Sequence, residues 1–153
     1  MREKFLYHIS ALGTGIFALI LILFAYLSRQ ERLSAQILLM LILTSVIGWG
    51  IKLFHKKKRP DFDPKTKWNY SWPIRKMIEI DEQSFPSLHA ARSTGLLIVL
   101  GNHLPSLKLI VFLGILAFLV CASKVWLKRH DTYDVIGGIA LGTLTALGAL
   151  FYI

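Results

Sequence analysis

Three short polar segments of this 153-residue chain carry side chains that could bind and attack a phosphate group. Their basic, hydroxyl, imidazole and carboxylate residues are Lys52, Arg59, Ser87, His89, Lys124, His130 and Asp134. Lysine and arginine donate hydrogen bonds to phosphate oxygens, and the planar fork of arginine suits bidentate contacts. Two histidines can divide the remaining chemistry, because one attacks phosphorus while the other protonates the leaving oxygen. These residue types therefore indicate phosphoryl chemistry.

The spacing of these residues predicts shared local surfaces. Lys52 and Arg59 are seven positions apart, about two helical turns, and face the same way if the helix continues. Ser87 begins a hydrophobic run, and the N-terminus of a helix favours anions. His130 and Asp134 are four positions apart, which places them on one side of a helical turn. The Asp134 carboxylate would then accept a hydrogen bond from one imidazole nitrogen and leave the other free as nucleophile or base.

Long hydrophobic runs must position the three segments. Hydrophobic residues make up 54% of the chain, and a bilayer span takes roughly 20 apolar residues. We expect an all-α fold, a polytopic membrane bundle of about five transmembrane helices, over residues 5–27, 34–54, 87–104, 107–126 and 133–153. The chain is treated as a single membrane-embedded domain over residues 1–153. Even numbers of spans separate the polar segments, so all three are expected at one membrane face.

The long connection over residues 55–86 begins with basic residues and continues with Trp68, Tyr70 and Trp72. Aromatic residues of this kind favour the membrane–water interface. The stretch 72–80 could form a short helix on that interface, with its apolar side in the bilayer. Two interpretations remain open: an anchoring loop, or the lip of a site that admits an amphipathic substrate from the bilayer.

Other residues near the segments have simpler explanations. We assign the lysines at 56–58 to membrane topology or lipid head groups. Arg92, in the early turns of the third span, could pair with an acid or contact substrate. Gly138 and Gly142 form a small-xxx-small pair, which predicts close helix packing. Cys121 is expected to be a buried structural thiol, so neither a disulfide nor a cysteine metal site is proposed.

Together, the three segments resemble the motifs of the type-2 phosphatidic acid phosphatase (PAP2) superfamily. The matching residues are Lys52 with Arg59-Pro60, then Pro86-Ser87-Leu88-His89, and then Ser123-Lys124 with His130 and Asp134. The spacing within each motif agrees with the family pattern. Two residue types depart from it. Leu88 replaces the usual glycine, which is expected to crowd the approach to the backbone N–H, and Lys124 replaces the usual arginine, which keeps the charge but loses the fork.

The resemblance implies a metal-independent lipid phosphatase that uses no cofactor and forms a phosphohistidine. His130 is then the expected nucleophile, Asp134 the residue that orients it, and His89 the general acid for the departing group. The implied phosphate-binding residues are Lys52, Arg59, Ser87, Leu88 and Lys124, with Arg92 as a further candidate for substrate contact. Two other classes remain open: a lipid phosphotransferase that uses the same intermediate, and a non-catalytic membrane protein that binds or transports lipid.

A basic site with nearby aromatic residues, set in a membrane, suits a phosphorylated membrane lipid. The net charge of +9 fits anionic lipid at least as well as nucleic acid, and no nucleic-acid-binding fold supports the latter. The family implies lipid A phosphates, phosphatidylglycerol phosphate, phosphatidic acid or polyprenyl diphosphate as substrates. A multiply charged head group such as that of lipid A is the first candidate.

Two arguments about membrane orientation disagree. In the five-span topology, fifteen of the 18 lysine and arginine residues lie on the side of the motifs, so the positive-inside rule favours a cytoplasmic site. The resemblance to phosphatases of bacterial envelope lipids favours the periplasmic face of the inner membrane. We expect the periplasmic face, with the C-terminal Ile153 on the opposite side.

Overall fold

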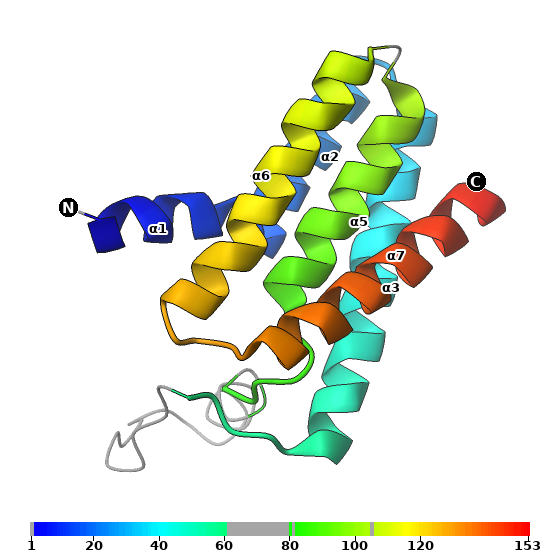
Figure 1. Ribbon diagram of the computed structural model, residues 1–153. Helices are drawn as coiled ribbons and strands as arrows, with labels where there is room; N and C mark the ends of the chain where they lie inside the picture. Colours follow the sequence, from blue (N-terminus) through cyan, green and yellow to red (C-terminus); the bar gives the residue numbers. More distant parts are fainter. Residues whose placement is uncertain (1, 61–79, 81, 105) are drawn as a thin grey trace.

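The computed structural model describes residues 2–60, 80, 82–104 and 106–153, and helices dominate these ranges (Figure 1). The helices are α1 (Arg2–Ala11), α2 (Gly15–Leu27), α3 (Glu31–His55), α5 (Leu88–His103), α6 (Leu107–Trp126) and α7 (Thr132–Tyr152). Within the described ranges, the only β-type pairing is an isolated bridge between Lys58 and Gln83. The predicted all-α membrane bundle is confirmed.

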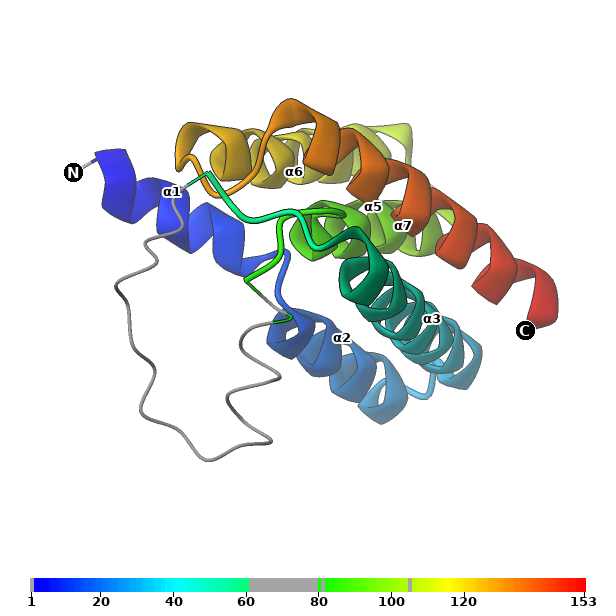
Figure 2. The same ribbon diagram turned by 90° about the horizontal axis from the view of Figure 1, so that it is seen from below.

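Helix α5 lies at the centre of the bundle and packs against α3, α6 and α7 (Figure 1 and Figure 2). Its contact with α7 is close because two glycines of α7 face it. A Cβ atom at Gly138 would overlap the carbonyl oxygen of Ser87, and one at Gly142 would overlap that of Ala91. The predicted small-xxx-small contact is therefore confirmed, and it holds the first turn of α5 against the second and third turns of α7.

Three of the described helices, α3, α6 and α7, are long and apolar enough to cross a membrane. Helices α1 and α2 count together as a fourth candidate span, but a bend of 46° separates them. The uninterrupted helix predicted over residues 5–27 is therefore wrong. The reason is local: the hydroxyl oxygen of Thr14 accepts a hydrogen bond from the N–H of Phe17 at 3.3 Å and so caps a new helix.

The third predicted span corresponds to α5, which has 16 residues and is shorter than the roughly 20 that a span takes. Five full-length spans are therefore not found among the described residues. The aromatic residues of the predicted interfacial segment, Trp68, Tyr70 and Trp72, lie outside the described ranges, so that segment remains a prediction.

Apolar side chains occur both inside and outside the bundle. The core between α2, α3, α5 and α7 includes Ala18, Ile37, Met40, Val99 and Ala146. Large hydrophobic side chains are also exposed on the outer helix faces, among them Leu23, Phe24, Phe112, Phe118 and Leu144. Extended apolar surface marks contact with a membrane or a partner. In a chain with several candidate spans, these faces are the ones that meet lipid.

Candidate active site

The polar segments meet at one end of the bundle, where α3 and α6 end and α5 and α7 begin (Figure 1). The groups whose charges act on His130 are Arg59, Lys52, Asp134 and Lys124. Those that act on His89 are Lys124, Arg92, His130 and Arg59. Residues from all three segments therefore share one electrostatic environment, as their predicted position on a common face requires.

The first segment leaves its helix before it reaches Arg59. Helix α3 ends at His55, because Lys56 takes a left-handed conformation with a φ of 48° and its N–H bonds the carbonyl oxygen of Lys52 at 3.2 Å. Lys52 and Arg59 would share a helix face only if the helix continued to Arg59, and that condition is not met. Both charges nevertheless act on His130, so it is the loop that brings the arginine to the site.

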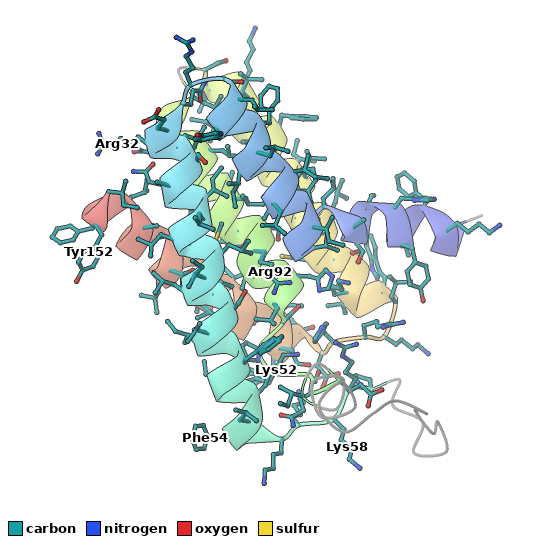
Figure 3. The ribbon with its side chains drawn as sticks, turned by 180° about the vertical axis from the view of Figure 1, so that it is seen from behind. Arg32, Lys52, Phe54, Lys58, Arg92 and Tyr152 are labelled. Carbon is teal, nitrogen blue, oxygen red and sulfur yellow. The ribbon has the colours of Figure 1, made fainter. Side chains whose placement is uncertain are left out.

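Lys52 and Lys124 are buried cations. Lys52 is 1% exposed, lies on the inner side of α3 (Figure 3), and donates a hydrogen bond to the carbonyl oxygen of Gln83 at 2.6 Å. Lys124 is buried in the last turn of α6, and its carbonyl oxygen accepts the N–H of His130 at 3.2 Å. Two buried ammonium groups give this end of the bundle a positive potential that would attract an anion.

Ser87 stands at the N-cap of α5 and is completely buried. Its N–H donates to the carbonyl oxygen of Asp134 at 3.0 Å, whereas its Oγ has no hydrogen-bond partner among the described residues. A buried polar atom left without a partner costs about 1–3 kcal/mol, so a ligand oxygen would be favoured there.

The side chain of Leu88 packs between α3 and α7 against Leu141, in room left by Gly48. The leucine side chain therefore fills part of the hydrophobic core between these helices.

Both oxygens of the Asp134 carboxylate accept hydrogen bonds, although none comes from His130. Its Oδ1 accepts a hydrogen bond from Nζ of Lys57 at 2.8 Å. Its Oδ2 accepts one from the N–H of Asp131 at 2.9 Å and another from the hydroxyl of Ser84. Nδ1 of His130 lies 3.8 Å from Oδ2, beyond hydrogen-bond range. The predicted direct bond is therefore wrong, because Asp131 and Asp134 form the capping box of α7 and the carboxylate turns toward that helix end.

Lys57 belongs to this network. Its Nζ lies 2.8 Å from Oδ1 of Asp134 and 2.9 Å from Oδ2 of Asp131. Partial burial favours the neutral amine, but the hydrogen bonds and charges of Asp134 and Asp131 raise the pKa of Lys57 above its ordinary value. Lys57 therefore has two carboxylate partners at the site, which its assignment to topology or lipid head groups did not include.

His130 lies in the turn between α6 and α7 and is 3% exposed. Burial, together with the positive charges of Arg59 and Lys52, lowers the pKa of His130 to about 3, against the opposing effect of Asp134. The ring is therefore neutral near pH 7, which is the form that a nucleophile or base requires. Nδ1 faces Oγ of Ser84 at 3.4 Å, so Nε2 is the nitrogen left for a ligand.

Arg92 lies one turn beyond His89 on α5 (Figure 3). Its Nη2 is 3.4 Å from Oγ of Ser45 on α3, and its charge acts on His89.

Sequence reasoning missed the site positions of Lys57, Gln83 and Ser84. No spacing rule identifies these residues, because each reaches the site only when the fold brings distant segments of the chain together.

No group of three or more histidine, cysteine, aspartate or glutamate side chains gathers among the described residues as metal ligands would. Metal independence is not tested by this finding and remains a prediction. The same holds for the absence of a cofactor.

The characterised proteins that are similar to this chain include sphingosine-1-phosphate phosphatases. Sphingosine-1-phosphate phosphatase 2 of Mus musculus is 24% identical over 151 residues, which cover 92% of this chain and 41% of the mouse protein. The Homo sapiens protein of the same name is 25% identical over 154 residues, which cover 94% of this chain and 37% of that protein. The chain thus spans about two fifths of the length of these relatives.

Two crystal structures share the fold. LpxE of Aquifex aeolicus matches with a TM-score of 0.78 at 24% identity, covering 98% of this chain and 86% of that one. A transmembrane PAP2-type phosphatidylglycerolphosphate phosphatase from Bacillus subtilis matches with a TM-score of 0.70 at 26% identity, covering 98% and 75%. The sequence model of the PAP2 superfamily matches residues 33–153, well over half of the chain. The protein therefore belongs to the PAP2 superfamily.

Proposed function

We propose that this protein is an integral membrane lipid phosphatase that cleaves a phosphomonoester or diphosphate through a phosphohistidine on His130, without a metal ion. The observation that carries the proposal is a buried imidazole among the charges of Arg59, Lys52 and Lys124, which favour its neutral form. A neutral ring can attack phosphorus, while the cations attract the phosphate and offset the charge that develops during transfer. The buried Oγ of Ser87 adds a further donor at the same end of the bundle.

The proposed reaction has two steps. The bound anionic phosphate offsets the positive charges around His89, so His89 takes up a proton when substrate binds. Nε2 of His130 then attacks phosphorus, so a P–N bond forms while the P–O bond to the lipid breaks, and protonated His89 gives its proton to the departing oxygen. Water then attacks the phosphohistidine, His89 accepts its proton, and inorganic phosphate leaves the ring free. The negative charge of Asp134 favours the positively charged ring that exists between the two steps.

A phosphorylated membrane lipid is the proposed substrate class. An apolar cavity of about 140 Å³ lies beside α2, α5 and α6, and its lining includes Leu12, Phe17, Leu96 and Val120. Gly13, next to Leu12, packs against the carbonyl oxygen and Cβ of His89, so part of the cavity wall lies near the first turn of α5. The lining is almost wholly hydrocarbon, so it suits van der Waals contact with an acyl or prenyl chain.

Several head groups are candidates. The relatives are named for sphingosine 1-phosphate and phosphatidylglycerolphosphate. Both belong in a substrate panel with lipid A, phosphatidic acid and polyprenyl diphosphate. For location, we propose a bacterial inner membrane, in line with the bacterial sources of the two structures that share the fold, with the site on the periplasmic face.

Phosphate release by the purified protein in detergent, with EDTA present, tests this proposal across the panel. Wild-type protein should release phosphate, and His130→Ala should lose at least about 10³-fold in kcat/KM because the nucleophile is gone. Near-normal turnover by His130→Ala would exclude the phosphohistidine, and loss of wild-type activity with EDTA would exclude metal independence. Transfer of phosphate to a second lipid, with little free phosphate, would instead support the phosphotransferase alternative.

A further inference from the structure

We infer that Ser84 is a positioning residue that links the carboxylate of Asp134 to Nδ1 of His130 and sets the tautomer of the ring. The inference rests on the proposed function, in which Nε2 of His130 attacks phosphorus. A serine relay takes the place of a direct hydrogen bond between the histidine and the aspartate, whose Nδ1 and Oδ2 atoms are 3.8 Å apart.

The position of the hydroxyl is the first support for this relay. Ser84 is completely buried, its Oγ bonds Oδ2 of Asp134, and the same Oγ lies 3.4 Å from Nδ1 of His130. A separation of 3.4 Å is long for a hydrogen bond, but hydrogen bonds in catalytic sites are often long until substrate binds. The serine is therefore placed to hold the ring and the carboxylate at once.

The direction of the hydrogen bonds follows from the carboxylate. Ionised Asp134 can only accept, and it already accepts N–H donors from Lys57 and Asp131. The Ser84 proton must then point to Oδ2, so that only oxygen lone pairs face His130. A lone pair can hold Nδ1 only if that nitrogen carries a proton. The neutral ring is thus the Nδ1–H tautomer, and the lone pair of Nε2 is free to attack.

Backbone contacts hold Ser84 in place. Its N–H donates to the carbonyl oxygen of Lys57 at 2.6 Å, and the adjacent residues Lys58 and Gln83 form the isolated bridge. Because the side chain of Lys57 also pairs with Asp134, one residue fixes both the serine and the carboxylate that it bonds. The hydroxyl is therefore part of a closed network that is buried at Ser84 and Asp134 and partly exposed at Lys57.

The relay has a defined task during the reaction. When Nε2 of His130 bonds phosphorus, the ring carries a positive charge that it shares with Nδ1–H. The oxygen of Ser84 accepts that N–H, and the negative charge of Asp134 lies directly behind it. No proton leaves the serine, so its contribution is orientation and charge stabilisation.

Substitution of the hydroxyl tests the inference. With dioctanoyl phosphatidic acid in detergent as the probe, Ser84→Ala should lower kcat roughly 10- to 100-fold with KM nearly unchanged, because the phosphate-binding groups remain. Ser84→Cys, which keeps a weak donor and acceptor, should lie between Ser84→Ala and wild type. Ser34→Ala is the matched control and should retain wild-type kcat, because that buried hydroxyl bonds the carbonyl oxygen of Ile22 on another part of the bundle.

Nitrogen-15 NMR of histidine-labelled protein gives a readout that packing alone would not move. His130 should be the Nδ1–H tautomer in wild type and in Ser34→Ala, and a mixture in Ser84→Ala. Wild-type kcat or an unchanged tautomer in Ser84→Ala would overturn the relay. Failure of the wild-type protein to release phosphate from any lipid would instead remove the proposed function, while the tautomer measurement would still decide whether Ser84 orients the ring.

Discussion

The imidazole of His130 loses its hydration on burial and faces the charges of Arg59 and Lys52, so its protonated form is disfavoured. A pKa of about 3 lies well below the ordinary value of 6.5. The ring should therefore stay neutral as the pH falls from about 8 to 5, and should take up a proton only near pH 3. A nitrogen-15 NMR titration in detergent measures this, with the His130→Ala spectrum identifying the signal. A midpoint near 6.5 would contradict the buried, cation-lined position.

At the scale of elements, the site depends on how closely α5 and α7 pack. The N–H of Ser87 bonds the carbonyl oxygen of Asp134 at 3.0 Å, which joins the second and third motifs through the backbone. Glycine is needed on α7 because the carbonyl oxygens of α5 occupy the space that a Cβ atom would take at Gly138 and Gly142. The close approach of the two backbones at these glycines therefore sets the distance between the second and third motifs.

This contact can be tested away from the active-site end. Gly142→Ala should lower the free energy of unfolding by about 1–3 kcal/mol, since the new methyl group meets the backbone oxygen of Ala91, which cannot move aside. Gly114→Ala on α6 is the matched control, because nothing lies within 4 Å of its Cβ position. Thermal unfolding in one detergent compares the two variants. Equal Tm values would contradict the close packing of α5 on α7.

At the scale of the whole molecule, α7 carries the C-terminus away from the end that holds the site (Figure 1). The orientation proposed above then places Ile153 in the cytoplasm. In a Gram-negative host, green fluorescent protein fused after Ile153 should fluoresce, and alkaline phosphatase at the same place should be inactive, because each folds on one side only. An active alkaline phosphatase fusion would put the site in the cytoplasm, as the distribution of basic residues favours.

The sequence by itself determined the properties that depend on local composition and spacing. Long apolar runs dictate helices in a membrane, and the Gly138 and Gly142 pair already indicated the close helix contact. The motif residues are brought together at one end of the bundle because the spans alternate in direction. In these respects the fold and the candidate site follow from short-range rules.

Only the tertiary structure decided which groups pair within the site. The four-residue spacing of His130 and Asp134 predicted a direct hydrogen bond, yet Lys57 and Ser84 compete for the carboxylate from 77 and 50 positions away along the chain. The cap at Thr14 likewise begins a new helix inside the apolar run that predicted one helix over residues 5–27. A carboxylate bonds the donors that the folded chain brings nearest, and no local spacing rule contains that information.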